Sequence, residues 1–272
     1  MHEWLRKMLQ QPAVGVEGVG GTTGQPLCFL IDQIRQPDVL EKLYSLSEIP
    51  KIDLLLQGTE FSSLQDHGPI WIVTYARSEA ASLAARICSD KRSGIALETM
   101  NTDAALQQAR HLLKVADPER GFSLARYYDP AFWVAWALTW PDAALYGPWS
   151  RVYTPPATSA AGSWRVWPAP DETPGAAAQT PTVTSETLEA FKLTRWWYWI
   201  NSQTQGSPIS DTALPLVIDN LQLLTKHGIE EGRHLQRLLP MLGNARWNES
   251  SEVMELLRAN IPPYKKVQIL EA

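Results

Sequence analysis

The stretch LCFLID, residues 27–32, is a short apolar run that ends on an acidic side chain. A run of this kind is typical of a strand buried on both faces of a sheet. Similar runs recur along the chain, and segments with helical periodicity separate them. The further predicted strands are IDLLLQG (52–58), GPIWIVTYA (68–76), GIALETM (94–100) and FSLARYYD (122–129). Strands that alternate with helices favour an α/β fold, here with a mixed or mostly parallel sheet flanked by helices.

The composition changes on both sides of this region, which we take as residues 27–167. Residues 168–183 are rich in Pro, Ala and Thr, and we expect a linker there. Residues 184–272 show helical periodicity only, which predicts a smaller all-helical C-terminal lobe. Residues 1–26 are a Gly-rich lead-in that we expect to be flexible. The lead-in lacks the Lys that a phosphate-binding loop places before Ser or Thr.

The composition also limits the possible partners. The 272 residues are 44% hydrophobic, and the net charge is −5. This balance provides no basic footprint for nucleic acid or an anionic membrane surface. The sequence holds no apolar run long enough for a membrane span and no signal peptide at its start. Cys28 and Cys88 lie in apolar contexts typical of buried thiols. We therefore expect a cytoplasmic protein.

Two acidic residues, Asp32 and Asp129, close predicted strands. Ligands of open α/β sheets bind at that edge, where two carboxylates can do acid–base work or hold a divalent ion. A structural role is the alternative. Arg126 lies inside the stretch LARYYDP (124–130) and needs a carboxylate or several carbonyls if it is buried. Asp129 before Pro130 is a natural N-cap for the next helix. We favour the structural role.

Other catalytic signatures are missing from the sequence. It contains no GxSxG elbow, no HExxH and no CxxC motif. We therefore expect no catalytic residues, no metal and no cofactor, and a protein that is not an enzyme.

Tryptophan is unusually frequent. The chain has 12, and nine of them fall between Trp133 and Trp199. Large aromatics build cores, but they also anchor partner proteins. In the stretch RWWYWIN (195–201), a helix would place aromatics on every side, with Trp196, Trp199 and Ile200 as the buried stripe. The sheet domain or a partner protein could cover the rest. Our candidate partner-binding residues are Trp164, Trp167, Trp196, Trp197, Tyr198 and Trp199.

Several stretches, in order, resemble one family. They are LCFLID, LLLQGTEF, HGPIWIV, the HLLKV helix, LARYYDP and LYGPW, together within residues 27–152. The pattern is similar to the type VI secretion effector-adaptor family, the Tap/Tec-type chaperones that carry a domain of unknown function. The motif residues carried over by position are Asp32, Gly58, Thr59, Gly68, Pro69, Arg126, Tyr128, Asp129, Gly147 and Pro148.

The resemblance implies a non-catalytic adaptor with two protein partners. One is a cognate secreted effector, and the other is the spike (VgrG-type) protein onto which the effector is mounted. An enzyme remains the alternative, namely a metal-assisted hydrolase with an Asp32/Asp129 site at the C-terminal edge of the sheet.

Overall fold

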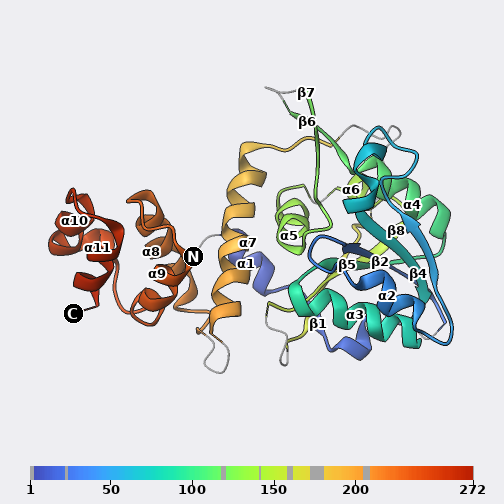
Figure 1. The fold of residues 1–272 in the computed structure, drawn as a ribbon, viewed down its shortest axis with the longest axis horizontal. Helices are drawn as coiled ribbons and strands as arrows, with labels where there is room; N and C mark the ends of the chain where they lie inside the picture. The colour runs from blue at the N-terminus through green and yellow to red at the C-terminus, as the bar shows by residue number, and fades with distance from the viewer. Residues whose placement is uncertain are drawn as a thin grey trace. The chain divides into compact units, whose positions relative to one another are not determined.

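A computed structural model describes residues 3–21, 24–117, 121–140, 142–157, 162–171, 181–204 and 209–271 (Figure 1). The chain forms two compact units, Arg6–Arg195 on the one hand and Met1–Leu5 with Trp196–Ala272 on the other. The division falls inside helix α7 (Ser185–Gln203). Most of the predicted linker, residues 172–180, lies outside the described residues.

The larger unit is built on a seven-stranded sheet in the order β1-β9-β8-β5-β2-β4-β3. The strands are β1 (Ala13–Val14), β2 (Pro26–Asp32), β3 (Lys51–Leu54), β4 (Pro69–Tyr75), β5 (Gly94–Thr99), β8 (Trp149–Thr154) and β9 (Trp164–Pro168). The helices around it are α2 (Val39–Tyr44), η2 (Ser62–His67), α3 (Glu79–Lys91), α4 (Thr102–His111), α5 (Pro130–Thr139) and α6 (Ala143–Tyr146). The predicted α/β class is confirmed, with a sheet flanked by helices and followed by C-terminal helices.

The strand directions correct the sequence-based expectation of a mixed or mostly parallel sheet. Every ladder of the seven-stranded sheet is antiparallel. Helix α3 does connect two strands that run the same way, β4 and β5, as the alternating pattern indicates. However, β2 lies between them and pairs antiparallel with both. Periodicity reveals the crossover but not the strand inserted into it, because pairing partners are set by contacts distant in sequence.

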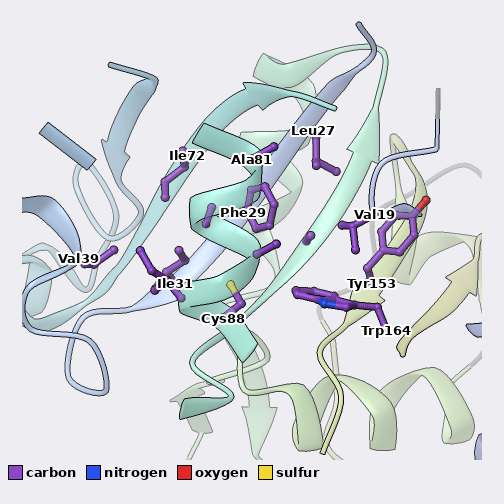
Figure 2. Close-up of a cluster of buried hydrophobic side chains, with 14 of the residues drawn as sticks. Val19, Leu27, Phe29, Ile31, Val39, Ile72, Ala81, Cys88, Tyr153 and Trp164 are labelled. Atoms are coloured by element: carbon purple, nitrogen blue, oxygen red, sulfur yellow. The ribbon is translucent and has the colours of Figure 1, made fainter. Parts of the chain in front are cut away.

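One face of the sheet is covered by α3. Leu27, Phe29 and Ile31 alternate along β2 and point toward Ala81 and Cys88 of the helix (Figure 2). All of these side chains are buried. Ser78 caps the start of the helix, because its side chain accepts a hydrogen bond from the Ala81 amide at 3.1 Å. Burial of this apolar face stabilises the unit.

Aromatic side chains form a second cluster around α5. Tyr127, Trp133, Trp136 and Trp149 are fully buried, and neighbouring ring centroids lie 5.7–6.5 Å apart. Tyr127 donates to the Ala109 carbonyl at 2.7 Å, and Trp149 donates to the Ala105 carbonyl at 3.2 Å. These two bonds tie the cluster to α4. Most of the tryptophans between 133 and 167 are therefore core residues.

The predicted strand 122–129 is wrong in its extent. Strand β7 (Gly121–Leu124) ends at Leu124 and pairs with β6 (Lys114–Asp117) in a separate two-stranded sheet. Residues after Leu124 turn sharply, and the Asp129 amide donates to the Arg126 carbonyl at 2.9 Å. Arg126 is consequently in a turn rather than in the middle of a covered strand.

The Gly-rich lead-in contains regular structure. It holds α1 (Glu3–Leu9), β1 and a short 3₁₀ turn, η1 (Val16–Gly18). Strand β1 pairs with β9 at the edge of the sheet, and the side chain of Val19 is buried in the α3 cluster. The part of this segment from Arg6 onward belongs to the larger unit. Its expected flexibility stays a prediction.

The smaller unit is helical, as predicted. Beyond α7 it contains α8 (Leu214–Lys226), α9 (Gly232–Leu238), η3 (Leu239–Met241), η4 (Trp247–Glu249), α10 (Ser251–Arg258) and α11 (Pro263–Leu270). Buried Asn220 holds its loops together. Its amide nitrogen donates to the carbonyls of Leu242 and Ala245, both at 2.8 Å, and its oxygen accepts from the Trp247 amide. Among the described residues, no helix is both long and apolar enough to cross a membrane.

Candidate functional site

The candidate site begins where β2 ends and α5 begins. Asp32 is the last residue of β2, whereas Arg126 and Asp129 belong to the turn that leads into α5. The fold brings these segments together, and Arg35, three residues after Asp32, joins them. We call Asp32, Arg35, Arg126 and Asp129 the Arg–Asp cluster.

Asp32 is the buried centre of this cluster. Its side chain is 4% exposed, whereas that of Arg126 is 48% exposed. Arg126 Nη2 lies 2.6 Å from Asp32 Oδ2, and the Ile34 amide donates to Asp32 Oδ1 at 3.0 Å. Of the two kinds of partner expected for a buried Arg126, the structure has the carboxylate, but the deeply buried member of the pair is Asp32 and not Arg126.

Arg35 bridges the two carboxylates. Its Nη2 lies 2.5 Å from Asp129 Oδ2, and its Nε lies 3.8 Å from Asp32 Oδ2. Its Nη1 also donates to the Arg92 carbonyl at 2.6 Å. One side chain therefore joins the end of β2, the end of α3 and the start of α5. Arg35 is not among the residues that the sequence singles out, and its role appears only in the folded chain.

Asp129 caps α5 as predicted. Its Oδ1 accepts from the Ala131 amide at 2.9 Å, and Pro130 occupies the first turn of the helix. Its Oδ2 is the atom that pairs with Arg35. Each of the four carboxylate oxygens of Asp32 and Asp129 thus accepts a hydrogen bond from an arginine or a backbone amide.

The surroundings of Arg126 favour its charged form. Burial raises the pKa of Tyr128, and the nearby Arg126 guanidinium partly offsets that rise. Burial alone would lower the pKa of Arg126, but Tyr128 and Asp32 raise it above its ordinary value. The Arg126 guanidinium lies 5.8 Å from the centre of the Tyr128 ring. The arginine therefore stays charged at every physiological pH.

A pocket of about 750 Å³ opens beside the cluster. Its charged lining residues are Arg35, Arg126 and Asp129 of the cluster and Arg195 of α7. Most of the remaining wall is apolar and includes Val115, Leu124, Phe132, Val183, Leu188 and Phe191. We call this pocket the α5–α7 groove. The described lining suits recognition of a mixed apolar and anionic surface.

The comparison with known families supports part of the resemblance. Residues 28–146 match the family model described as Domain of unknown function (DUF4123). The DUF4123 match contains the whole Arg–Asp cluster. Arg195 and the aromatic run of α7 lie beyond it. No curated protein and no solved structure matches the chain.

The first Gly-Pro pair of the expected motif has a structural explanation within the DUF4123 match. A Cβ on Gly68 would lie 2.6 Å from the Leu56 side chain. The Gly68 carbonyl accepts from Gln33 Nε2 at 2.8 Å. Pro69 opens β4, where a missing N–H group is tolerated.

The other motif residues shape turns. Gly58 has a φ of 74°, and Thr59 closes its turn by donating to the Leu56 carbonyl at 2.7 Å. Gly147 has a φ of 54°, and a Cβ there would lie 2.7 Å from the Gln108 side chain. The carbonyl of Pro148 accepts from Thr99 Oγ1 at 3.0 Å.

The aromatic candidates are only partly accessible. Trp164 and Trp167 are buried, and Trp167 Nε1 donates to Thr154 Oγ1 at 3.0 Å. Trp197 and Tyr198 are also buried, at 7% and 6% exposure. Trp196 and Trp199 are half-buried and meet edge to face, with ring centroids 5.6 Å apart. The predicted buried stripe holds for Ile200 but is wrong for the two tryptophans. A partner-binding role for these aromatics stays a prediction.

Proposed function

We propose that this chain is a non-catalytic cytoplasmic adaptor, or chaperone, that binds a type VI secretion effector. In this proposal it helps to load the effector onto the spike (VgrG-type) protein. Two findings support the proposal: the ordered stretches that resemble the effector-adaptor family, and the DUF4123 match over residues 28–146. The identities of the two partners rest on the resemblance.

The observation that carries the proposal is the pairing inside the Arg–Asp cluster. Asp32 and Asp129, the acids best placed for chemistry by sequence, already accept from arginines at 2.6 and 2.5 Å. Paired groups of this kind hold chain segments in place and support a neighbouring surface. The adjacent α5–α7 groove is such a surface, and it favours recognition over turnover.

The metal-assisted hydrolase is the competing proposal. A metal ion at Asp32 and Asp129 would have to displace Arg35 and Arg126 from the carboxylate oxygens that they occupy. Within the part of the chain that the structure describes, no three His, Cys, Asp or Glu side chains are grouped to hold a metal ion. The geometry therefore gives this alternative little support.

Co-expression tests the adaptor proposal. The chain, carrying an affinity tag, is produced with the large protein encoded next to it, and the eluate is analysed by size-exclusion chromatography with light scattering. A stoichiometric complex is expected. An effector from an unrelated gene cluster is the matched control and should not be retained. Failure to retain the neighbouring protein, together with stoichiometric metal at Asp32 and Asp129, would favour the hydrolase.

A further inference from the structure

We infer that the α5–α7 groove binds an extended segment of the effector that presents a carboxylate next to a large apolar side chain. The carboxylate pairs with Arg195, and the apolar side chain lies against Phe132, Leu188 and Phe191. This inference rests on the proposed adaptor function and identifies the surface and chemistry of recognition.

The charges of the groove point to an anionic group. Three arginines and one aspartate line it. Both oxygens of Asp129 are already used, one by Arg35 and the other by the Ala131 amide. Arg195 is exposed, and among the described residues it has no acidic partner. The described lining of the groove therefore carries an uncompensated positive charge.

The position of Arg195 is suited to binding a carboxylate. Its guanidinium lies 5.6 Å from the centre of the Phe191 ring, one turn earlier on α7. Stacking over an aromatic ring restricts the guanidinium and leaves its N–H groups free to form a bidentate pair. A bidentate arginine–carboxylate contact is among the stronger polar contacts available to a protein surface.

The apolar wall points to a protein segment as the source of that carboxylate. Phe132 and Phe191 are half-buried and meet edge to face, with centroids 5.2 Å apart. Leu188 is 47% exposed. A free inorganic anion would leave these side chains in water, whereas an aliphatic or aromatic side chain would bury them. The volume of about 750 Å³ is enough for a few side chains.

Two substitutions test the inference on the full chain. Arg195→Glu reverses the unpaired charge, and Leu188→Asp places a charge on the apolar wall. Lys192→Glu is the matched control, because Lys192 is on the same helix, is 66% exposed and does not line the groove. All three sites are surface positions, so thermal melts should match the wild type. Arg195→Gln is a milder second variant if the reversal alters folding.

The measurement is the Kd for the purified effector encoded next to the chain. Arg195→Glu and Leu188→Asp should each weaken binding about 10-fold or more. Lys192→Glu should stay within about 2-fold, as is usual for exposed charges. Binding of overlapping effector peptides should identify one acidic segment. A peptide in which the acidic residue is replaced by Lys should bind the Arg195→Glu chain more tightly than it binds the wild-type chain.

Each contrary result has a separate meaning. Wild-type affinity in both groove variants would overturn the groove inference and leave the adaptor proposal intact. An equal loss of effector affinity in Lys192→Glu would indicate a general charge effect and would also overturn the groove inference. Absence of any binding by the wild-type chain would overturn the adaptor proposal, and the groove inference with it.

Discussion

Arg126 and Asp32 are 94 residues apart in sequence, yet Nη2 of the arginine lies 2.6 Å from Oδ2 of the acid. The contact fastens the turn before α5 to the end of β2. Replacing Arg126 with Ala should destabilise the protein by about 2–3 kcal/mol. A fully buried pair would cost more, but Arg126 is 48% exposed, and Arg35 Nε remains 3.8 Å from Asp32. Urea denaturation measures the change.

A double-mutant cycle separates this pair from the rest of the cluster. The variant that carries both Asp32→Asn and Arg126→Ala should be destabilised by less than the sum of the two single-variant effects. Strictly additive effects would show that the two side chains do not stabilise each other. Loss of partner binding in Arg126→Ala without a change in stability would instead make Arg126 a contact residue.

Gly147 should tolerate no side chain. Its φ of 54° disfavours other residues, and a Cβ would press on Gln108, which donates to the carbonyls of Ala144 and Leu145. We expect Gly147→Ala to cost about 3 kcal/mol by thermal or urea unfolding. Gly58 is the control. Its φ is 74° but nothing lies within 4 Å of its Cβ position, so Gly58→Ala should cost only about 1 kcal/mol. Equal losses at both sites would contradict the steric explanation.

The aromatic turn of α7 should divide into two classes. Trp197 and Tyr198 are buried, so alanine at either position should destabilise the fold by about 3–5 kcal/mol. Trp196 and Trp199 are half-buried, so alanine at either position should reduce the stability of the fold by less. If either anchors a partner, its alanine variant keeps a wild-type melt and loses about 2 kcal/mol or more of affinity. Normal melting of Trp197→Ala would contradict the buried assignment.

The two thiols should be unreactive in the folded protein. Burial raises the pKa of Cys28 to about 12 and that of Cys88 further still. At pH 8 neither should react with a disulfide reagent until the chain is unfolded, when both should react. These pKa values exceed the unfolded value of about 8.5, so the thiols favour folding below that pH. Their contribution is lost as the pH rises from about 8.5 toward 12. Rapid labelling of native Cys28 would contradict this.

The sequence revealed those parts of the fold that depend on neighbouring residues. The apolar run at 27–32, the Ser78 cap and the Asp129 cap all follow from local patterns, and the structure has them. The place of β2 between β4 and β5 does not follow from a local pattern, because it depends on pairing between segments distant in sequence. The predicted strand at 122–129 is longer than β7 because side chains keep alternating past Leu124, whereas the pairing with β6 ends there.

The candidate site was only partly predictable. Asp32, Arg126 and Asp129 stand out in the sequence because charges interrupt apolar runs. Arg35 and Arg195 do not: Arg35 interrupts no apolar run, and at Arg195 the aromatic residues that follow draw the attention. Their importance appears only when the fold places one across two carboxylates and the other on the wall of the groove.

In the proposed function, the chain connects an effector to the spike protein. The most direct measurement mixes the purified effector and spike protein with and without this chain and follows complex formation by size-exclusion chromatography with light scattering. We predict that effector and spike co-elute only when the chain is present, and that Arg195→Glu weakens this effect while Lys192→Glu does not. Effector that binds the spike equally well without the chain, or a chain that binds neither protein, would overturn the proposed adaptor function.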